Sequence, residues 1–374
     1  MRKNLILISL DTVRADVAYS GRFKTINLLR KHGISFINTI SSAPLTPVSH
    51  ATVFTGLQPY NHGIRHLFKE KLKPGITTLA SLLKSKGYKT GAIVSCPGMN
   101  KWYGFNKGFD TYDDEIPRLA DGSDPLKTVD VKKRGTALKR ADLVVERAGR
   151  WLEKNRKNKF FLFIHFFDAH WPYEAPEKYG GKNIYEEEVA YADHYLGLFI
   201  QKLKDEKLFD SATIICFSDH GEDLEGMYEN DKGGMKLGHP EESGHGCLLY
   251  DQTQKVVLVM KDPGLKKNIN IEEQVRLVDL MPTVLDLLGI KRVGGKIDGR
   301  SLLPVVNGKK LNLPAYSETF YPEEQTKATG GKFSNSRNKK SIRSNKFKTI
   351  FHLGGDAVEC YDLGHDINEL KNQV

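Results

Sequence analysis

Short runs of apolar residues recur along the chain and predict buried β-strands. The first is Leu5-Ile6-Leu7-Ile8. Similar runs follow at 92–94, 160–164, 213–217 and 256–260. Unbroken apolar runs of this length are typical of strands that are covered on both faces, as in a parallel sheet. The pattern therefore predicts a central sheet whose middle strands have no exposed face.

Between these runs, apolar residues recur at helical spacing and predict amphipathic helices. Four are expected, at 79–86, 137–154, 186–204 and 278–288. Strands that alternate with helices in this way predict an α/β fold. We expect a large, mostly parallel central sheet with helices on both of its faces.

The pattern changes after about residue 315. A stretch rich in Lys, Arg, Ser, Asn and Gly precedes a late strand at 348–352. We therefore expect a catalytic domain over 1–314 and a small C-terminal subdomain over 315–374 that packs on it. Two polar, Gly-rich stretches, 105–130 and 225–246, are expected to be long surface loops, which in compact domains are often functional.

Composition narrows the class of protein. The 374 residues are 39% hydrophobic and 27% charged, which is ordinary for a soluble globular chain and excludes collagen, coiled coil, full-length disorder and a disulfide scaffold. No apolar run approaches the roughly 20 residues of a membrane helix, so no membrane segment is expected. Residues 1–10 resemble a signal peptide, but the apolar run is short and ends on Asp11, which favours a first core strand.

Cysteine usage adds a prediction about the compartment. The four cysteines are scattered without the spacing of a metal site: Cys96, Cys216, Cys247 and Cys360. Reduced thiols in a cytoplasmic protein are the simplest interpretation.

Several polar side chains that can bind metal follow directly after predicted strands. The first strand ends at Asp11, the strand from 160 is followed by Asp168 and His170, and the strand from 213 is followed by Asp219 and His220. In an open α/β sheet, sites form at the carboxyl ends of the strands. Carboxylate oxygens and imidazole nitrogens are ligands of Zn²⁺, Mn²⁺ and similar ions. A metal site at this edge of the sheet is therefore predicted.

The segment 43–56 supplies a candidate nucleophile. Its hydroxyl residue Thr46 precedes Pro47 and an apolar stretch, so it can lie at a helix N-terminus, where backbone N–H groups favour anions. A metal ion bound to this hydroxyl would lower its pKa and activate it. The alternative is that Thr46 is only a helix cap.

A series of motifs then resembles the sulfatases of the alkaline phosphatase superfamily over nearly the whole chain. In family order these are 8–16, 46–63, Gly108-Phe109-Asp110, 167–173, 218–222, 244–251, 278–283, 298–302 and the tail from Tyr361-Asp362-Leu363. One such motif is weak evidence, but eight or more in order are strong evidence. The resemblance implies an alkaline phosphatase/sulfatase-like fold and a metal-dependent ester hydrolase.

Two departures from the family pattern bear on the chemistry. The resemblance implies Cys or Ser, converted to formylglycine, at the place of Thr46, with Pro and Arg where this chain has Val48 and His50. Threonine is not a substrate for that conversion, so no formylglycine is expected. Thr12 stands where calcium-type sulfatases have a second Asp, which favours zinc or manganese over calcium or magnesium.

The resemblance also implies roles for individual residues. Asp11, Asp219 and His220 would bind one metal ion, with Thr46 as its fourth ligand and as nucleophile. A second ion would be held by His245 with Asp168 and perhaps His170, although the spacing of Asp168 and His170 fits less well. Alternatively, His170 would contact the anionic oxygens of the substrate.

Weaker candidates complete the predicted site. His50, four residues after Thr46, would orient the nucleophile or bind an oxygen, and Lys101 would bind substrate. Acidic residues of the long loop are expected to be solvated: Glu222, Glu225, Glu229, Asp231, Glu241 and Glu242. The remaining histidines, including His165 and His239, are expected to be packing or surface groups.

We therefore expect a hydrolase of phosphoric esters, either diesters or monoesters, that acts through a phospho-Thr46 intermediate. A sulfuric ester hydrolase is the nearest alternative, and a transferase of phosphoethanolamine or phosphoglycerol is a third. The cofactor would be one or two divalent ions per chain and the partner a small anionic ester. The sequence does not specify an oligomeric state.

The net charge of +10, from 56 Lys+Arg and 46 Asp+Glu, first suggests a polyanion partner. The charge is local, because 325–348 carries eight Lys/Arg and no acidic residue and 132–159 carries eleven Lys/Arg and three acidic residues. No nucleic-acid-binding motif accompanies it, so no nucleic acid is expected. We expect 132–159 to be a solvated helical face and 325–348 to be a mobile loop that attracts the substrate to the site.

Overall fold

The computed structural model describes residues 4–129, 138–176, 178–224, 238–240, 242, 244–291, 295–328 and 337–374. Its strands are β1 (Leu5–Leu10), β2 (Ile34–Phe36), β3 (Thr39–Ile40), β4 (Lys89–Ile93), β5 (Thr111–Asp113), β6 (Phe160–Phe166), β7 (Thr213–Phe217), β8 (Lys255–Val256), β9 (Leu258–Lys261), β10 (Ile269–Ile271), β11 (Val275–Arg276), β12 (Ala315–Thr319), β13 (Lys339–Arg343), β14 (Phe347–His352) and β15 (Val358–Asp362).

Its helices are α1 (Ala15–Ala18), α2 (Lys24–His32), α3 (Thr46–Thr55), α4 (Pro59–His62), α5 (Leu79–Ser85), α6 (Pro125–Thr128), α7 (Ala141–Asn155), α8 (Ile184–Asp205), α9 (Asp251–Gln254), α10 (Leu280–Leu287), α11 (Leu303–Val306) and α12 (Tyr321–Ala328). The chain divides into two units of three segments each. Unit 1 comprises 1–35, 77–218 and 257–270, and unit 2 comprises 36–76, 219–256 and 271–374.

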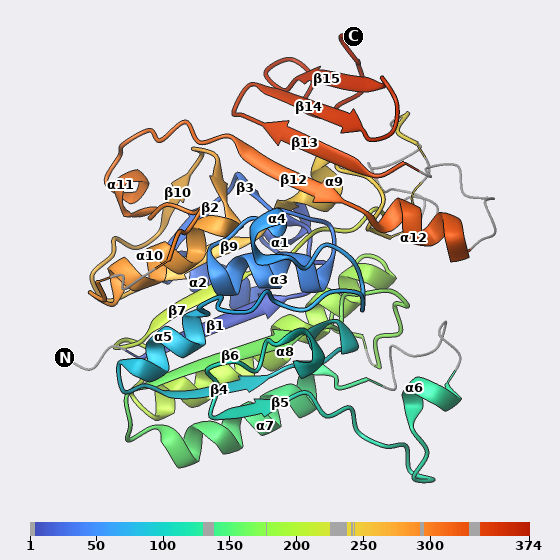
Figure 1. Ribbon diagram of the computed structural model, residues 1–374. Coiled ribbons are helices and arrows are strands. Elements are labelled where there is room, and N and C mark those ends of the chain that lie inside the picture. Colours follow the sequence, from blue (N-terminus) through green and yellow to red (C-terminus); the bar gives the residue numbers. More distant parts are fainter. Residues whose placement is uncertain are drawn as a thin grey trace. The chain divides into compact units, whose positions relative to one another are not determined.

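Unit 1 is built on an eight-stranded sheet in the order β10-β2-β9-β7-β1-β6-β4-β5 (Figure 1). The strands from β7 to β5 in this order run parallel, whereas β9 runs antiparallel to β7. Every residue of β1 and β6 is buried, as their apolar runs predict. The α/β prediction is confirmed.

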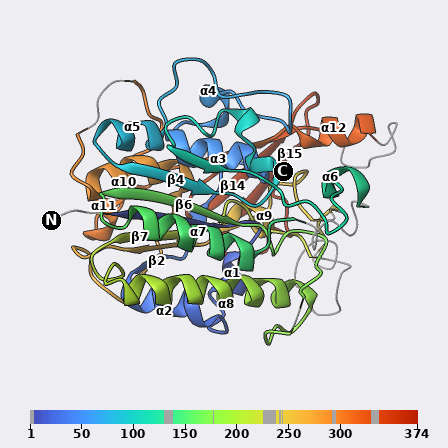
Figure 2. The ribbon, with the colours of Figure 1, turned by 90° about the horizontal axis from the view of Figure 1, so that it is seen from below.

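Helices cover both faces of this sheet. On one face, α7 packs against β4 and β6, and α8 packs beside α7 and α2 (Figure 2). On the other face, α5 packs against β4. α7 begins at Ala141, where the carboxylate of Asp168 accepts a hydrogen bond from the Ala141 amide at 3.0 Å. The helix was expected to begin at residue 137, which lies outside the described ranges, so the observed start is four residues later.

The apolar run 256–260 forms two strands instead of the expected single one. β8 pairs with β3 in a three-stranded sheet, β11-β3-β8, and β9 pairs with β7. Between them, the Val257 amide donates to Ser218 Oγ at 2.8 Å, and the Ser218 amide donates to the Val257 carbonyl at 3.1 Å. The long loop expected at 105–130 also differs, because it contains β5 and α6.

Unit 2 contains a four-stranded antiparallel sheet, β12-β13-β14-β15, whose first strand begins at Ala315. The mobile loop expected over 325–348 is wrong for residues 339–343, which form β13, and for the start of β14. Lys339, Arg343 and Lys348 are buried. Residues 329–336 lie outside the described ranges, as do residues 132–137 of the other basic segment, 132–159.

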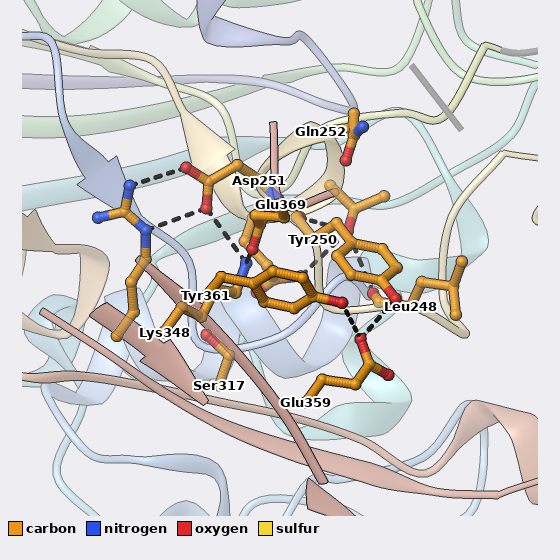
Figure 3. Close-up of polar contacts among 12 residues, drawn as sticks. Leu248, Tyr250, Asp251, Gln252, Ser317, Lys348, Glu359, Tyr361 and Glu369 are labelled. Carbon is orange, nitrogen blue, oxygen red and sulfur yellow. Dashed lines mark hydrogen bonds and ion pairs between the residues drawn. The ribbon is translucent and has the colours of Figure 1, made fainter. Parts of the chain in front are cut away.

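Two of these buried basic residues, Arg343 and Lys348, have carboxylate partners, and Figure 3 labels Lys348 with Asp251 and Glu369. Lys348 Nζ lies 3.1 Å from Asp251 Oδ1 and 2.6 Å from Glu369 Oε1. Arg343 donates two hydrogen bonds to Asp251, at 3.0 and 2.7 Å. These four residues, which we call the ion cluster, connect β13 and β14 to the start of α9 and to the tail of the chain.

Candidate active site

Thr46 begins helix α3, and Pro47 occupies its first turn. Backbone N–H groups in the first turn have no acceptor within the helix, so the proline costs no helical hydrogen bond. The side chain of Thr46 is buried, with the residue 6% exposed. The predicted placement of a hydroxyl at a helix N-terminus is therefore present in unit 2. The backbone N–H groups of that first turn favour an anion beside the hydroxyl.

His220 directs one ring nitrogen toward this hydroxyl. Its Nδ1–H donates to the Gly221 carbonyl at 3.0 Å, so in the neutral ring Nε2 carries the lone pair and can act as an acceptor or as a metal ligand. Nε2 lies 3.4 Å from Thr46 Oγ1 and 3.4 Å from Asp219 Oδ2. Asp219 and His220 are fully buried.

The spacing of these three atoms fits a metal ion. Tetrahedral nitrogen and oxygen ligands at about 2.0–2.1 Å from zinc lie roughly 3.3 Å apart. Ligands at right angles around a calcium ion, at about 2.4 Å, lie roughly 3.4 Å apart. The observed 3.4 Å separations match both geometries, so the donor set of Thr46, Asp219 and His220 suits a divalent ion without selecting its identity.

His50 lies one helical turn after Thr46, as its spacing predicts. Its Nδ1–H donates to the Thr46 carbonyl at 2.8 Å and lies 3.5 Å from Asp219 Oδ2. Ser41 and Ser49 donate to the Asp219 carbonyl at 2.5 and 2.8 Å. These contacts fix both the start of α3 and the backbone of Asp219.

His245 belongs to the same unit and has a partner that the sequence did not suggest. Its Nδ1–H donates to Glu222 Oε1 at 2.8 Å, and its ring centroid lies 4.3 Å from that of His220. Burial, together with the nearby His220, holds the pKa of His245 well below its usual value. Glu222 is fully buried, so the expectation that it is solvated is wrong. Its contact orients the ring and places the hydrogen on Nδ1, and burial keeps the ring neutral.

Other acidic residues of that loop divide between buried and undescribed positions. Glu242 is 7% exposed and accepts hydrogen bonds from the amides of Cys247 and Leu248, so it too is not solvated. Burial raises the pKa of Glu242 to about 8. The remaining four lie outside the described residues: Glu225, Glu229, Asp231 and Glu241.

Asp11 is buried at the end of β1 in unit 1, with the residue 1% exposed. His165 of β6 is fully buried, and its Nε2 lies 3.0 Å from Asp11 Oδ2. The expectation that His165 only packs or lies at the surface is therefore wrong. The sequence contained one signal for it: a single ring with polar nitrogens inside an unbroken apolar run needs a buried partner.

Asp168 and His170 also belong to unit 1. Asp168 Oδ1 accepts from Ala141, as above, and lies 3.5 Å from Arg140 Nε. Burial raises the pKa of Asp168 to about 6 although Arg140 lowers it. His170 stacks on Phe167 with ring centroids 4.1 Å apart and donates Nδ1–H to the Trp171 carbonyl at 2.6 Å. The contacts of Asp168 are those of a helix cap and an ion pair.

Lys101 is exposed and lies in a 3₁₀ turn, Lys101–Tyr103, of unit 1. Its Nζ is 3.6 Å from Asp114 Oδ1, and its side chain is 65% exposed.

His239, expected to be a packing or surface group, stacks on Tyr250 at 4.0 Å between ring centroids. The four cysteines form no disulfide.

Comparison with known proteins identifies the family to which the chain belongs. The family model described as Sulfatase matches residues 3–290, and a model described as N-sulphoglucosamine sulphohydrolase, C-terminal, matches 246–374. The chain belongs to the sulfatase family. Membership makes this sulfatase-family chain an ester hydrolase and implies a divalent metal cofactor, which the donor set of unit 2 fits.

The curated relatives of this sulfatase-family chain include arylsulfatase K of Bos taurus, 22% identical over 93% of this chain and 73% of the relative. The human arylsulfatase K is 23% identical with the same coverage. A phosphonate monoester hydrolase of Agrobacterium radiobacter has a TM-score of 0.73 at 20% identity, covering 99% of this chain and 91% of its own.

A further solved structure, in complex with its substrate D-glucosamine-2-N,6-O-disulfate, has a TM-score of 0.75 at 17% identity, covering 100% of this chain and 93% of its own. At these identities the structures establish the shared fold. None of the helices in the described parts of the chain has the length and apolarity to cross a membrane.

Proposed function

We propose that this chain is a metal-dependent hydrolase of phosphoric esters and that Thr46 is its nucleophile. The observation that carries the proposal is the position of Thr46 Oγ1, at the start of α3 and 3.4 Å from the unprotonated Nε2 of His220. A threonine hydroxyl cannot become formylglycine, so it has to act as a hydroxyl. A direct hydroxyl nucleophile suits phosphoryl transfer, which proceeds through a covalent phosphoenzyme.

The ion would be held by Thr46, Asp219 and His220, and we propose Asp11 as a further ligand. Support for Asp11 comes from the order of the strands, because β1 and β7 are parallel neighbours and Asp219 follows β7 by two residues. When bound, a divalent ion at such a site lowers the pKa of a coordinated hydroxyl and stabilises the charge that develops on the ester oxygens. The mixed nitrogen and oxygen donors favour zinc or manganese.

The residues of the chain then act as follows. Thr46 Oγ1 gives its proton to solvent and attacks phosphorus, the bond from phosphorus to the leaving oxygen breaks, the leaving group takes up a proton from solvent, and phospho-Thr46 forms. Water then attacks phosphorus, the bond from phosphorus to Thr46 Oγ1 breaks, Oγ1 takes up a proton, and the phosphate product leaves. His50 holds the Thr46 carbonyl and so the orientation of the first helical turn. The lone pair on His245 Nε2 can accept a hydrogen bond from water or substrate.

A sulfuric ester hydrolase is a second candidate. What favours it is the name of the curated relatives, arylsulfatase K, and the disulfated substrate of one structural neighbour. These relatives favour sulfate over phosphate, whereas the residue at position 46 favours phosphate. The structural neighbour that hydrolyses phosphonate monoesters is consistent with either substrate class for the fold.

The test compares turnover of nitrophenyl phosphate, bis-nitrophenyl phosphate and nitrophenyl sulfate by the metal-loaded protein. We expect either phosphate to be turned over faster than the sulfate, and Thr46→Ala to lower kcat/KM for it by about 10³-fold or more. Thr55→Ala, at the last residue of the same helix, is the matched control, because its hydroxyl donates to Ala51 in its own helix. Turnover of the sulfate well above that of both phosphates would contradict the assignment to phosphoric esters. Unchanged activity of Thr46→Ala would show that Thr46 is not the nucleophile.

A further inference from the structure

His165 occupies a position in unit 1 that packing alone does not explain. The β1–β6 register pairs Ser9 with His165, and side chains two residues apart in a strand share a face. Asp11, two residues after Ser9, therefore projects on the face that His165 occupies. His165 is fully buried within an otherwise apolar strand, where a polar ring is costly unless both nitrogens are bonded.

The hydrogen bonds of the ring fix its tautomer. An ionised Asp11 carboxylate can only accept, so His165 Nε2 must carry the hydrogen in the 3.0 Å contact with Asp11 Oδ2. On the other side of the ring, Ser95 Oγ lies 2.9 Å from Nδ1 and the Ser95 amide 3.5 Å from it. Ser95 Oγ also lies 2.6 Å from the His165 carbonyl, and its single hydrogen can be donated to only one of these two acceptors at a time.

These contacts run across three neighbouring strands. Asp11 follows β1, His165 lies in β6, and Ser95 follows β4, and these strands are adjacent in the sheet. The carboxylate of Asp11 is thus held through one oxygen by a donor that is itself held by Ser95. A hydrogen bond of this kind orients a metal-binding group and tunes it, and removing such a partner typically lowers metal affinity about 10- to 100-fold.

We propose that His165 is a positioning residue that presents Asp11 to the divalent ion, with Ser95 fixing the ring. The inference rests on the proposed function, because it takes Asp11 to be a metal ligand. It predicts that the N–H at the position of Nε2, and not the bulk of the ring, is what the site requires.

The experiment measures divalent-ion affinity of the apoprotein by calorimetry for the unmodified chain, His165→Gln and His165→Leu. A glutamine amide can place an N–H near the position of Nε2, whereas leucine fills similar space with no donor. We expect His165→Gln to bind zinc or manganese within a few-fold of the unmodified chain and His165→Leu to bind about 10- to 100-fold more weakly. Thermal melting of the metal-free variants checks that each is folded.

The outcomes separate this inference from the proposed function. If the unmodified chain binds no divalent ion, the proposed metal centre is wrong. If it binds and His165→Leu binds equally well, or if His165→Gln is as weak as His165→Leu, the positioning role is wrong. Should His165→Leu fail to fold, Ser95→Ala is measured instead: we expect about two- to tenfold weaker binding, and unchanged affinity would overturn the proposal.

Discussion

Asp219 is a fully buried carboxylate of unit 2 and Asp251 a half-buried one, and their partners are of different kinds. The described ion-pair partners of Asp219 are imidazoles, those of His50 and His220. The partners of Asp251 are the permanent cations Arg343 and Lys348. Burial raises the pKa of Asp251, but the two cations more than offset this and hold it well below its usual range.

The difference shows what each cluster is built for. In the ion cluster, the chain supplies its own positive charge, so the carboxylates are compensated without a ligand and the contacts stabilise the fold. Around Asp219, Nδ1 of His220 donates to a carbonyl and Nε2 faces Thr46 Oγ1 and Asp219 Oδ2. A buried carboxylate beside imidazole nitrogens supplies the donor types that a divalent ion binds. The basic sheet residues are thus structural, although the sequence alone suggested that they attract substrate.

Among the changes that test this comparison, Asp219→Ala is expected to have the largest effect. The change removes a proposed metal ligand, so we expect kcat/KM to fall by about 10³-fold or more. Metal content, measured on the purified protein, should fall with it. A variant that retains both its metal and its activity would place the ion elsewhere.

Lys348→Met should act on stability instead. It leaves Glu369 without its buried cation, whereas Asp251 keeps Arg343. Breaking a buried pair in this way typically costs about 3–5 kcal/mol. The free energy of unfolding from urea titration measures the loss, and the folded fraction should retain its kcat. The control is Lys340→Met in β13, where we expect a change within about 0.5 kcal/mol.

The double variant Lys348→Met with Glu369→Gln sharpens this prediction. Replacing the carboxylate removes the uncompensated charge, so the double variant should be more stable than Lys348→Met alone. A double variant that is less stable than both single variants would mean that the charges of the ion cluster do not carry its stability.

Glu242 shows a third way of burying a carboxyl, because its folded-state pKa of about 8 keeps it protonated near neutral pH. Its pKa is raised above the unfolded value, so the folded state binds more protons between the two values. The contribution of Glu242 to the free energy of unfolding is therefore largest below about pH 4.5 and falls as the pH rises toward 8. Urea titrations at pH 5 and 8.5 should differ less in Glu242→Gln than in the unmodified chain.

Glu222→Gln is expected to give the smallest of these effects. Glutamine can keep a contact with His245 but loses the charge, so the ring is held less firmly in its Nδ1–H tautomer. We expect kcat/KM to fall about 10- to 100-fold, as for other groups that orient an active-site histidine. Equal activity in Glu222→Gln and the unmodified chain would assign the pair to packing.

Local patterns predicted much of the fold, because the apolar runs at 160–164 and 213–217 carry their own signal. The boundaries that failed depend on distant residues. α7 begins at Ala141 because Asp168, far along the chain, accepts its amide. The run at 256–260 breaks because Ser218 binds the amide of Val257. Neither partner can be read from the sequence near the element.

The candidate site divides in the same way. Thr46 and His220 stand in motifs with fixed spacing, and the structure brings them together. Glu222 and His165 were missed because their roles depend on which side chain faces them across a loop or a sheet. A motif marks the residues that touch the chemistry, whereas the groups that hold them depend on the assembled fold.

The break at Val257 also constrains how the chain can be made. The polypeptide alternates between unit 1 and unit 2 in six segments, so it passes from one to the other five times. During synthesis, the central sheet cannot gain β9 until after unit 2 has received its first two segments, and unit 2 waits for the last residues of the chain. Neither unit corresponds to a continuous stretch of messenger RNA. A product truncated between residues 36 and 269 would therefore leave both units incomplete, whereas one truncated after residue 270 would lack only the last segment of unit 2.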